Sequence, residues 1–267
     1  MTNDVKHSLV LVLGFAHSGS TLLGRMLDMH TRVLCVGEMT RVEWTLDKNR
    51  TCGCGVQLHD CEFWSPRLSI LKSAGYDYRR FTPNVFDSVR TTTSADVIVD
   101  LSKTRIWRML RGWRAPLRIG QAAYILLLRD PRGIMASNIR TNRPLAHRLR
   151  QYRKWMRRQE RIARSDPERT LIMRYEDLCS DPRTTLRQVC AFIGLDYQEE
   201  MLRPADRIHH FINSSKSGYL RGSNELHTDE RWRQELNPNQ IRLIETALSS
   251  LPLLRTRYLE DLRAGSQ

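Results

Sequence analysis

Five short apolar runs stand apart along the chain, at residues 9–13, 33–36, 97–99, 124–128 and 170–173. Between them the apolar residues recur mostly at helical spacing. Continuous apolar strands separated by helices are typical of a parallel sheet that is covered on both faces. The pattern therefore predicts an α/β fold, a three-layer sandwich with a central parallel sheet.

Nothing in the sequence divides this pattern into separate units, because no internal repeat and no low-complexity linker interrupts it. We therefore expect one domain over residues 1–267. Two segments break the rhythm of strands and helices. Residues 49–64 are rich in cysteine and glycine, and residues 207–228 are rich in serine, glycine and histidine. Irregular segments of this kind predict loops over a site.

The first seven residues are short and polar, and they lead directly into the first apolar run. They lack the charged lead and small-residue cleavage site of a signal peptide, and no apolar run is long enough to span a membrane. We therefore expect a cytoplasmic protein with no transmembrane segment. In a reducing compartment the six cysteines are expected as free thiols or metal ligands rather than disulfides.

The clearest chemical signal follows the first predicted strand, where residues 14–21 read Gly-Phe-Ala-His-Ser-Gly-Ser-Thr before an apolar helix. Backbone N–H groups in such a turn, at the positive end of a helix dipole, bind phosphate or sulfate oxygens. An ordinary strand-to-helix turn is the alternative. Glycines at both ends and three hydroxyl residues favour a phosphate-binding loop.

The loop differs from that of nucleoside triphosphatases at one informative position. Ser20 follows Gly19, where a triphosphate-binding loop carries lysine. A small-molecule kinase of the phosphate-loop type stays the second candidate, with Asp100 as its arguable magnesium ligand.

Residues 14–23 resemble the 5′-phosphosulfate loop of sulfotransferases that use 3′-phosphoadenosine 5′-phosphosulfate (PAPS), with His17 where most relatives carry arginine or lysine. The motifs are similar to those of bacterial members and of tyrosylprotein and carbohydrate sulfotransferases. The resemblance implies the sulfotransferase version of the phosphate-loop nucleoside triphosphate hydrolase fold. It also implies PAPS as sulfuryl donor and 3′-phosphoadenosine 5′-phosphate (PAP) as product. We expect no metal, because a sulfuryl group carries less charge than a phosphoryl group and the sequence shows no second acidic site for magnesium. The implied loop contacts are His17, Ser18, Gly19, Ser20 and Thr21.

Two further segments resemble nucleotide contacts of the same family. Arg129 ends the fourth apolar run and Ser137 lies eight residues later, which is the family's spacing for the 3′-phosphate. An ion pair between Arg129 and Asp130 is the alternative. Residues 174–178 resemble a segment whose tyrosine seats the nucleotide, which makes Tyr175 a candidate, although a core aromatic is equally consistent with its chemistry.

Sulfuryl transfer needs a base for the acceptor hydroxyl, positive charge on the sulfuryl oxygens and a donor to the leaving oxygen. Resemblance to tyrosylprotein sulfotransferases makes Glu38 the candidate base, the alternative being a glutamate that stabilises a helix dipole. Lys103 is the candidate cation, with His17 as a second, and the alternative for Lys103 is a solvated lysine. Ser214 is the candidate donor to the leaving group, with Ser215 and Lys216 as nucleotide contacts and alternatives.

Three cysteines and a histidine lie within ten residues, as Cys52, Cys54, His59 and Cys61. They are enough for a tetrahedral zinc site, but structural zinc usually takes two separated ligand pairs. A metal site, a disulfide and local packing all stay open. We favour local packing, and therefore expect no metal.

The net charge of +14 and the isoelectric point near 10 favour anionic partners. Much of the charge lies in residues 140–169, where a predicted amphipathic helix sets Arg150, Lys154, Arg157, Arg158 and Arg161 opposite Leu149, Tyr152, Met156 and Ile162. A solvated face, acceptor recognition and nucleic-acid contact are the alternatives. No recognised nucleic-acid motif is present, so no nucleic-acid partner is expected. The acceptor could be a carbohydrate, a peptide tyrosine, a lipid or a small metabolite, and a homodimer stays open.

Overall fold

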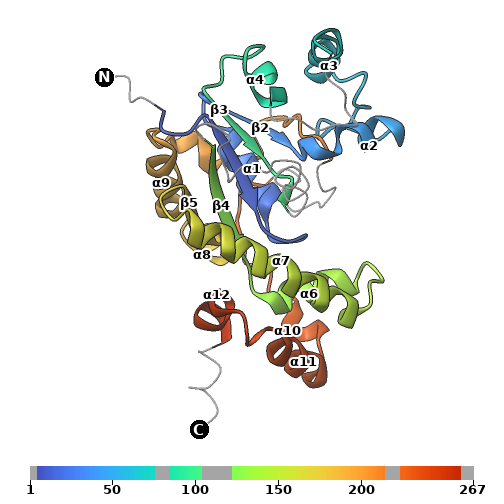
Figure 1. Cartoon of the computed structure of the whole chain (residues 1–267), viewed down its shortest axis with the longest axis vertical. Coiled ribbons are helices and arrows are strands. Elements are labelled where there is room, and N and C mark those ends of the chain that lie inside the picture. The colour runs from blue at the N-terminus through green and yellow to red at the C-terminus, as the bar shows by residue number, and fades with distance from the viewer. Residues whose placement is uncertain (1–4, 76–83, 104–121, 214–222, 260–267) are drawn as a thin grey trace.

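Five strands form one parallel sheet in the order β2-β3-β1-β4-β5. The structure is a computed structural model, and it describes residues 5–75, 84–103, 122–213 and 223–259 (Figure 1). The strands are β1 (Leu9–Leu13), β2 (Val33–Gly37), β3 (Val97–Asp100), β4 (Ala122–Leu128) and β5 (Thr170–Arg174). Each predicted apolar run is one of these strands, so the α/β prediction is confirmed.

Helices connect the strands and cover the sheet. The longer helices are α1 (Ser20–Asp28), α3 (Trp64–Ser73), α4 (Asn84–Arg90), α6 (Pro131–Ile139), α7 (Leu145–Ser165), α9 (Pro182–Ile193) and α11 (Pro238–Leu248). The shorter ones are α2 (Val42–Asp47), α8 (Tyr175–Ser180), α10 (Trp232–Glu235), α12 (Pro252–Leu254), η1 (Met39–Arg41), η3 (Glu199–Leu202) and η4 (Arg255–Leu259). Several begin at sequence signals, such as Asp130 before Pro131 in α6 and Asp181 before Pro182 in α9.

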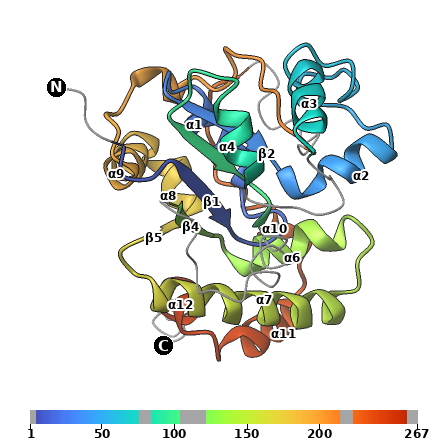
Figure 2. The same ribbon diagram turned by 45° about the horizontal axis from the view of Figure 1, so that its top comes forward.

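Two hydrophobic cores, one on each face of the sheet, give the three layers. Leu9, Leu11 and Leu13 of β1 belong to one core, together with residues of α3, α4, α6, α7 and α11. Val10 and Val12 belong to the other, together with residues of α1, α8 and α9. Figure 2 shows α7 running along one side of the molecule, with α11 and α12 next to it. Such double cover explains why β1 is apolar at every position.

The predicted amphipathic helix is α7, whose inner face buries Leu149, Tyr152, Met156 and Ile162. Its outer face carries the basic residues Arg150, Arg153, Lys154, Arg157, Arg158 and Arg161 around a shallow hollow. Among the residues that the structure describes, no helix is both long and apolar enough to cross a membrane.

The irregular segment after α9 returns to the edge of the sheet. Ile212 pairs with Gly37 in an isolated parallel bridge, and its N–H donates to the Val36 carbonyl oxygen at 3.0 Å. The segment therefore extends the sheet beyond β2 at the edge where the strands end. This position brings residues 209–213 beside the turn that follows β2.

Candidate active site

The turn between β1 and α1 is held by contacts to its backbone. His17 and Gly19 have left-handed conformations, with φ of 72° and 91°, which glycine adopts freely and histidine more readily than most residues. Gln159 donates from Nε2 to the Gly14 carbonyl oxygen, and Arg129 donates from Nη1 to the His17 carbonyl oxygen, both at 2.8 Å. These two carbonyls therefore have protein partners, while the positive end of α1 faces the cleft described below.

Tyr175, at the start of α8, packs its ring directly on Gly19. A Cβ added to Gly19 would lie 2.3 Å from Tyr175 Cδ2, so a larger residue would displace the ring. The guanidinium of Arg129 lies over the same ring, 4.5 Å from its centroid. Tyr175 is 3% exposed and also lines the cleft. Tyr175 is therefore a core aromatic that also borders the cleft, and its contact with a nucleotide stays a prediction.

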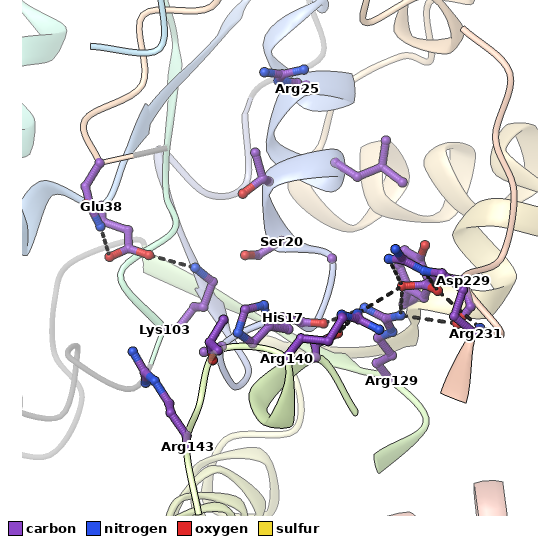
Figure 3. Close-up of a pocket in the computed structure, with 18 of the residues that line it drawn as sticks. His17, Ser20, Arg25, Glu38, Lys103, Arg129, Arg140, Arg143, Asp229 and Arg231 are labelled. Carbon is purple, nitrogen blue, oxygen red and sulfur yellow. Dashed lines mark hydrogen bonds and ion pairs between the residues drawn. The ribbon is translucent and has the colours of Figure 1, made fainter. Parts of the chain in front are cut away.

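A cleft of about 720 Å³ opens where the strands end (Figure 3). Every strand contributes to it through the segment that follows, because parallel strands all end at one edge of the sheet. The contributions of β1 to β5 include, in order, Ser20, Glu38, Lys103, Arg129 and Tyr175. The lining cations outnumber the carboxylates Glu38 and Asp229, and they are Arg25, Arg50, Lys103, Arg129, Arg140, Arg143 and Arg231. This charge suits an anionic ligand.

Glu38 and Lys103 point toward one another at one end of the cleft (Figure 3). Lys103 Nζ lies 2.8 Å from Glu38 Oε1, and Asn213 Nδ2 donates to Glu38 Oε2, also at 2.8 Å. The Glu38 N–H donates to the Ile212 carbonyl oxygen at 2.8 Å. The carboxylate is therefore fixed by contacts to the segment after β3 and to the segment beside β2.

Asp100 binds the backbone next to Glu38 and Lys103, and it does not line the cleft. Its carboxylate accepts hydrogen bonds from the Met39 N–H at 2.9 Å, the Ser102 N–H at 2.8 Å and the Ser102 hydroxyl at 3.0 Å. Burial raises the pKa of Asp100 to about 6, although these hydrogen bonds oppose the rise. Both carboxylate oxygens are thus engaged by protein donors, which gives Asp100 a positioning role for the neighbours Glu38 and Lys103.

At the other end of the cleft, Arg129 is paired with a carboxylate. Arg129 Nη2 lies 3.0 Å from Asp229 Oδ2, and Arg231 Nη2 lies 2.9 Å from the same oxygen. Arg140 Nη2 approaches it at 4.0 Å and donates to the Ser137 hydroxyl at 2.8 Å. Hydrogen bonds from Arg231 and the charge of Arg129 hold the pKa of Asp229 well below its usual range. Three guanidinium groups therefore converge on one anion, beside the predicted residue Ser137.

The alternative partner of Arg129, Asp130, is engaged elsewhere. Its carboxylate caps α6 at the Arg132 N–H and pairs with the Arg132 guanidinium at 2.7 Å. The charged residues at the end of β4 therefore have two different roles. Arg129 is directed to the cleft, and Asp130 and Arg132 are directed to the helix and its packing.

The His17 side chain is exposed to the cleft, but the protein atoms that surround the cleft still desolvate its imidazole. Burial, followed by the charges of Arg129, Lys103, Arg148 and Arg143, lowers the pKa of His17 to about 4. The imidazole is therefore neutral near pH 7 in the protein without a ligand. An arginine at the same position would instead be charged at every physiological pH.

The cleft brings together most of the residues predicted from sequence, namely His17, Gly19, Ser20, Thr21, Glu38, Lys103, Arg129, Ser137 and Tyr175. Ser18 is different, because it is 1% exposed and its hydroxyl lies against Gly14 behind the loop. Ser214, Ser215 and Lys216 lie outside the described residues.

Sequence reasoning missed several lining residues, namely Arg25, Arg50, Arg140, Arg143, Asn213, Asp229 and Arg231. Arg140 had a usable signal, because it lies three residues after Ser137 and so shares its helical face. Asp229 and Arg231 belong to no motif that we recognise.

Comparison with known proteins agrees with the resemblance to sulfotransferases that the sequence motifs suggest. The sequence model of the sulfotransferase family matches residues 76–199. A sulfotransferase domain from the curacin biosynthetic pathway superposes with a TM-score of 0.65 at 19% identity, covering 91% of this chain and 98% of that one. The matched segment is somewhat less than half of the chain, and the superposition shows that the chain has a sulfotransferase fold.

Two further solved structures share the sulfotransferase fold. The sulfotransferase domain of the Synechococcus PCC 7002 olefin synthase has a TM-score of 0.66 at 23% identity, covering 92% of this chain and 97% of that one. Mouse sulfotransferase SULT7A1, complexed with PAP, has a TM-score of 0.53 at 11% identity, covering 97% and 89%. No curated protein matches this chain significantly in sequence.

Proposed function

We propose that the chain transfers a sulfuryl group from PAPS to an acceptor hydroxyl. One observation carries the proposal. A single cleft joins an anion-binding cluster around Arg129 to the Glu38–Lys103 pair, with the phosphate loop between them. In support, mouse SULT7A1, which shares the fold, was solved with PAP.

The residues of the cleft fit a nucleotide with phosphates at two places. Arg129, Arg140 and Arg231 surround the Asp229 carboxylate, and this convergence on an anion supports a 3′-phosphate site beside Ser137. The start of α1 supplies the second anion site, for the 5′-phosphosulfate. The volume of about 720 Å³ lies within the usual range of nucleotide and cofactor sites.

PAPS, when bound, supplies an activated sulfuryl group whose leaving group is PAP. Glu38 accepts the proton of the acceptor hydroxyl while that oxygen bonds to sulfur. The bond from sulfur to the bridging oxygen breaks in line, and its electron pair leaves with PAP. Lys103, 2.8 Å from Glu38, supplies positive charge to the sulfuryl or bridging oxygens. Ser214 stays the predicted donor to the leaving oxygen.

A small-molecule kinase is the competing function, and it requires a carboxylate free to bind magnesium. Asp100 already accepts three protein hydrogen bonds, which argues against that role. The acceptor class, the cytoplasmic location and the oligomeric state stay predictions.

The direct test is transfer of labelled sulfate from PAPS to fractionated cell extracts, with EDTA present to remove magnesium. We expect a product that is labelled from PAPS in the presence of EDTA, and no product that depends on the protein when ATP labelled in its γ-phosphate and magnesium replace PAPS and EDTA. Magnesium-dependent labelling from ATP, with none from PAPS, would establish a kinase instead.

A further prediction concerns His17 and pH. Because its pKa is lowered to about 4 in the protein without a ligand, the ring is neutral there from about pH 6 to about pH 9, and we expect it to stay neutral when PAP binds. We expect the ratio of PAP affinities between wild type and His17→Asn, measured by calorimetry, to stay within about twofold over this range. Asparagine tolerates the left-handed backbone. A ratio that declines steadily as pH rises would mean that the ring takes up a proton when the 5′-phosphate of PAP binds.

A further inference from the structure

Four side chains with metal-binding atoms converge beside the sheet, at a distance from the residues assigned above to nucleotide binding. They are Cys52, Cys54, Cys61 and His210, and their ligand atoms all lie within 4.8 Å of one another. The Sγ atoms of Cys54 and Cys61 are 3.7 Å apart, and Cys61 Sγ is 3.2 Å from His210 Nδ1. Cys52 is 3% exposed and Cys61 is not exposed at all.

These separations resemble the edges of a zinc tetrahedron. With bonds of about 2.3 Å to sulfur and about 2.1 Å to nitrogen, the edges are roughly 3.8 Å between sulfurs and roughly 3.6 Å between sulfur and nitrogen. A disulfide would bring two sulfurs to about 2.05 Å and would use only two of the four groups. All six cysteines lie in the described residues and are free thiols. The four-way convergence is explained by an ion at its centre and not by a disulfide.

The fourth ligand comes from a distant part of the chain. The three cysteines lie in the loop between α2 and α3, whereas His210 lies 149 residues after Cys61. His59, the histidine that the sequence pattern suggested, instead lies 3.4 Å from Asp60, with 53% of its side chain exposed. The cluster therefore has two ligand sources separated in sequence, as structural zinc sites usually do.

The surrounding contacts fix His210 in place. The Trp64 indole N–H donates to the His210 carbonyl oxygen at 2.5 Å, and the Phe63 ring stacks on the imidazole with centroids 5.1 Å apart. The Gly53 N–H donates to the Phe211 carbonyl oxygen at 2.9 Å. A Cβ on Gly53 would lie 2.5 Å from the His209 carbonyl oxygen, so this close approach requires glycine. Such outer contacts orient metal ligands.

The surroundings also suit the charge of an occupied site. Three thiolates and one divalent ion leave a net charge of about −1. The guanidinium of Arg67 lies over the Phe63 ring, 3.8 Å from its centroid, and supplies a nearby positive charge.

We propose that Cys52, Cys54, Cys61 and His210 bind one structural zinc ion in a tetrahedral site. Four protein ligands leave no open position, so the ion has no direct part in catalysis. Zinc joins the loop before α3 to the segment of residues 209–213, in which the Asn213 amide contacts Glu38. This proposal replaces our sequence-based expectation of cysteine packing without metal. It does not depend on the transferase assignment, because zinc content is measured without any activity assay.

The test is elemental analysis of the full-length protein purified without chelator. We expect about one zinc per chain in wild type and in His59→Ala, and at least about tenfold less in Cys61→Ser and His210→Ala. His59→Ala is the matched control, because it removes an exposed imidazole from the same loop. Wild-type protein with less than about a tenth of an equivalent of zinc, or with iron in its place, overturns the proposal. Equal zinc loss in His59→Ala and His210→Ala would refute the ligand set.

A second measurement needs no ligand variant and so does not depend on whether the variants fold. Wild-type protein produced with cobalt in place of zinc should show the intense visible absorption of a tetrahedral cobalt site together with thiolate-to-cobalt charge transfer. The weak absorption of octahedral cobalt would contradict the proposal. A mass two protons lower than that of the reduced chain, with no metal bound, would establish a disulfide in its place.

Discussion

Glu38→Gln is expected to lower sulfuryl transfer by about 10²- to 10⁴-fold, because it removes the proposed base and keeps its shape. Glutamine can still accept the hydrogen bond from Asn213 Nδ2, so the position of the side chain is largely preserved. Affinity for PAP should stay within about threefold of wild type, since the proposed 3′-phosphate contacts lie at the other end of the cleft. Transfer rates and calorimetry on the same preparations separate the two effects.

Glu43→Gln serves as the control for this experiment. Glu43 lies in the first turn of α2, where a carboxylate stabilises the helix dipole. Its loss should change thermal stability slightly and leave transfer nearly intact. Glu38 itself precedes the short helix η1 and faces Lys103 rather than a helix N-terminus. If Glu38→Gln retained more than roughly a tenth of wild-type transfer, the base would have to be another group.

The strands and the phosphate loop could be read from the sequence because their signals are local. Residues 124–128 were read as a strand from their apolar run, and the observed strand Ala122–Leu128 adds two buried alanines. The turn after β1 could be recognised because glycine at both ends and a following helix are needed for its shape. Buried strands and anion-binding turns each depend on neighbouring residues only.

Contacts made across the fold were not accessible in the same way. His59 lies two residues from Cys61, yet the cluster uses His210, which the bridge between Gly37 and Ile212 brings to the same edge of the sheet. Likewise, nothing local links Asp229 to Arg129, which lies 100 residues earlier. Each pairing depends on the order of the strands in the sheet and on the path by which the later chain comes back to it. The spacing of residues within one segment predicts neither.

Arg129→Ala is expected to abolish the preference for PAP over 5′-AMP. A charge-assisted hydrogen bond contributes roughly 1.5 to 3 kcal/mol, so PAP affinity should decline about ten- to a hundredfold. Affinity for 5′-AMP, which lacks the 3′-phosphate, should change by less than about threefold. Arg150→Ala removes the same charge from the exposed face of α7 and should affect both nucleotides slightly and equally. Equal binding of PAP and 5′-AMP by wild type would refute the proposed role of Arg129.

Asp229 makes this prediction more specific, because a 3′-phosphate must compete with its carboxylate for Arg129. Asp229→Asn removes the competing charge but keeps the shape of the side chain, which is 9% exposed. PAP should then bind several-fold more tightly, while 5′-AMP binds as in wild type. In the double variant Arg129→Ala/Asp229→Asn, the gain in PAP affinity should largely disappear, because Arg129 is no longer present to bind the 3′-phosphate. Calorimetry on all four proteins measures this coupling. A gain of equal size with and without Arg129 would mean that Asp229 acts through the general field of the cleft rather than by occupying the 3′-phosphate position.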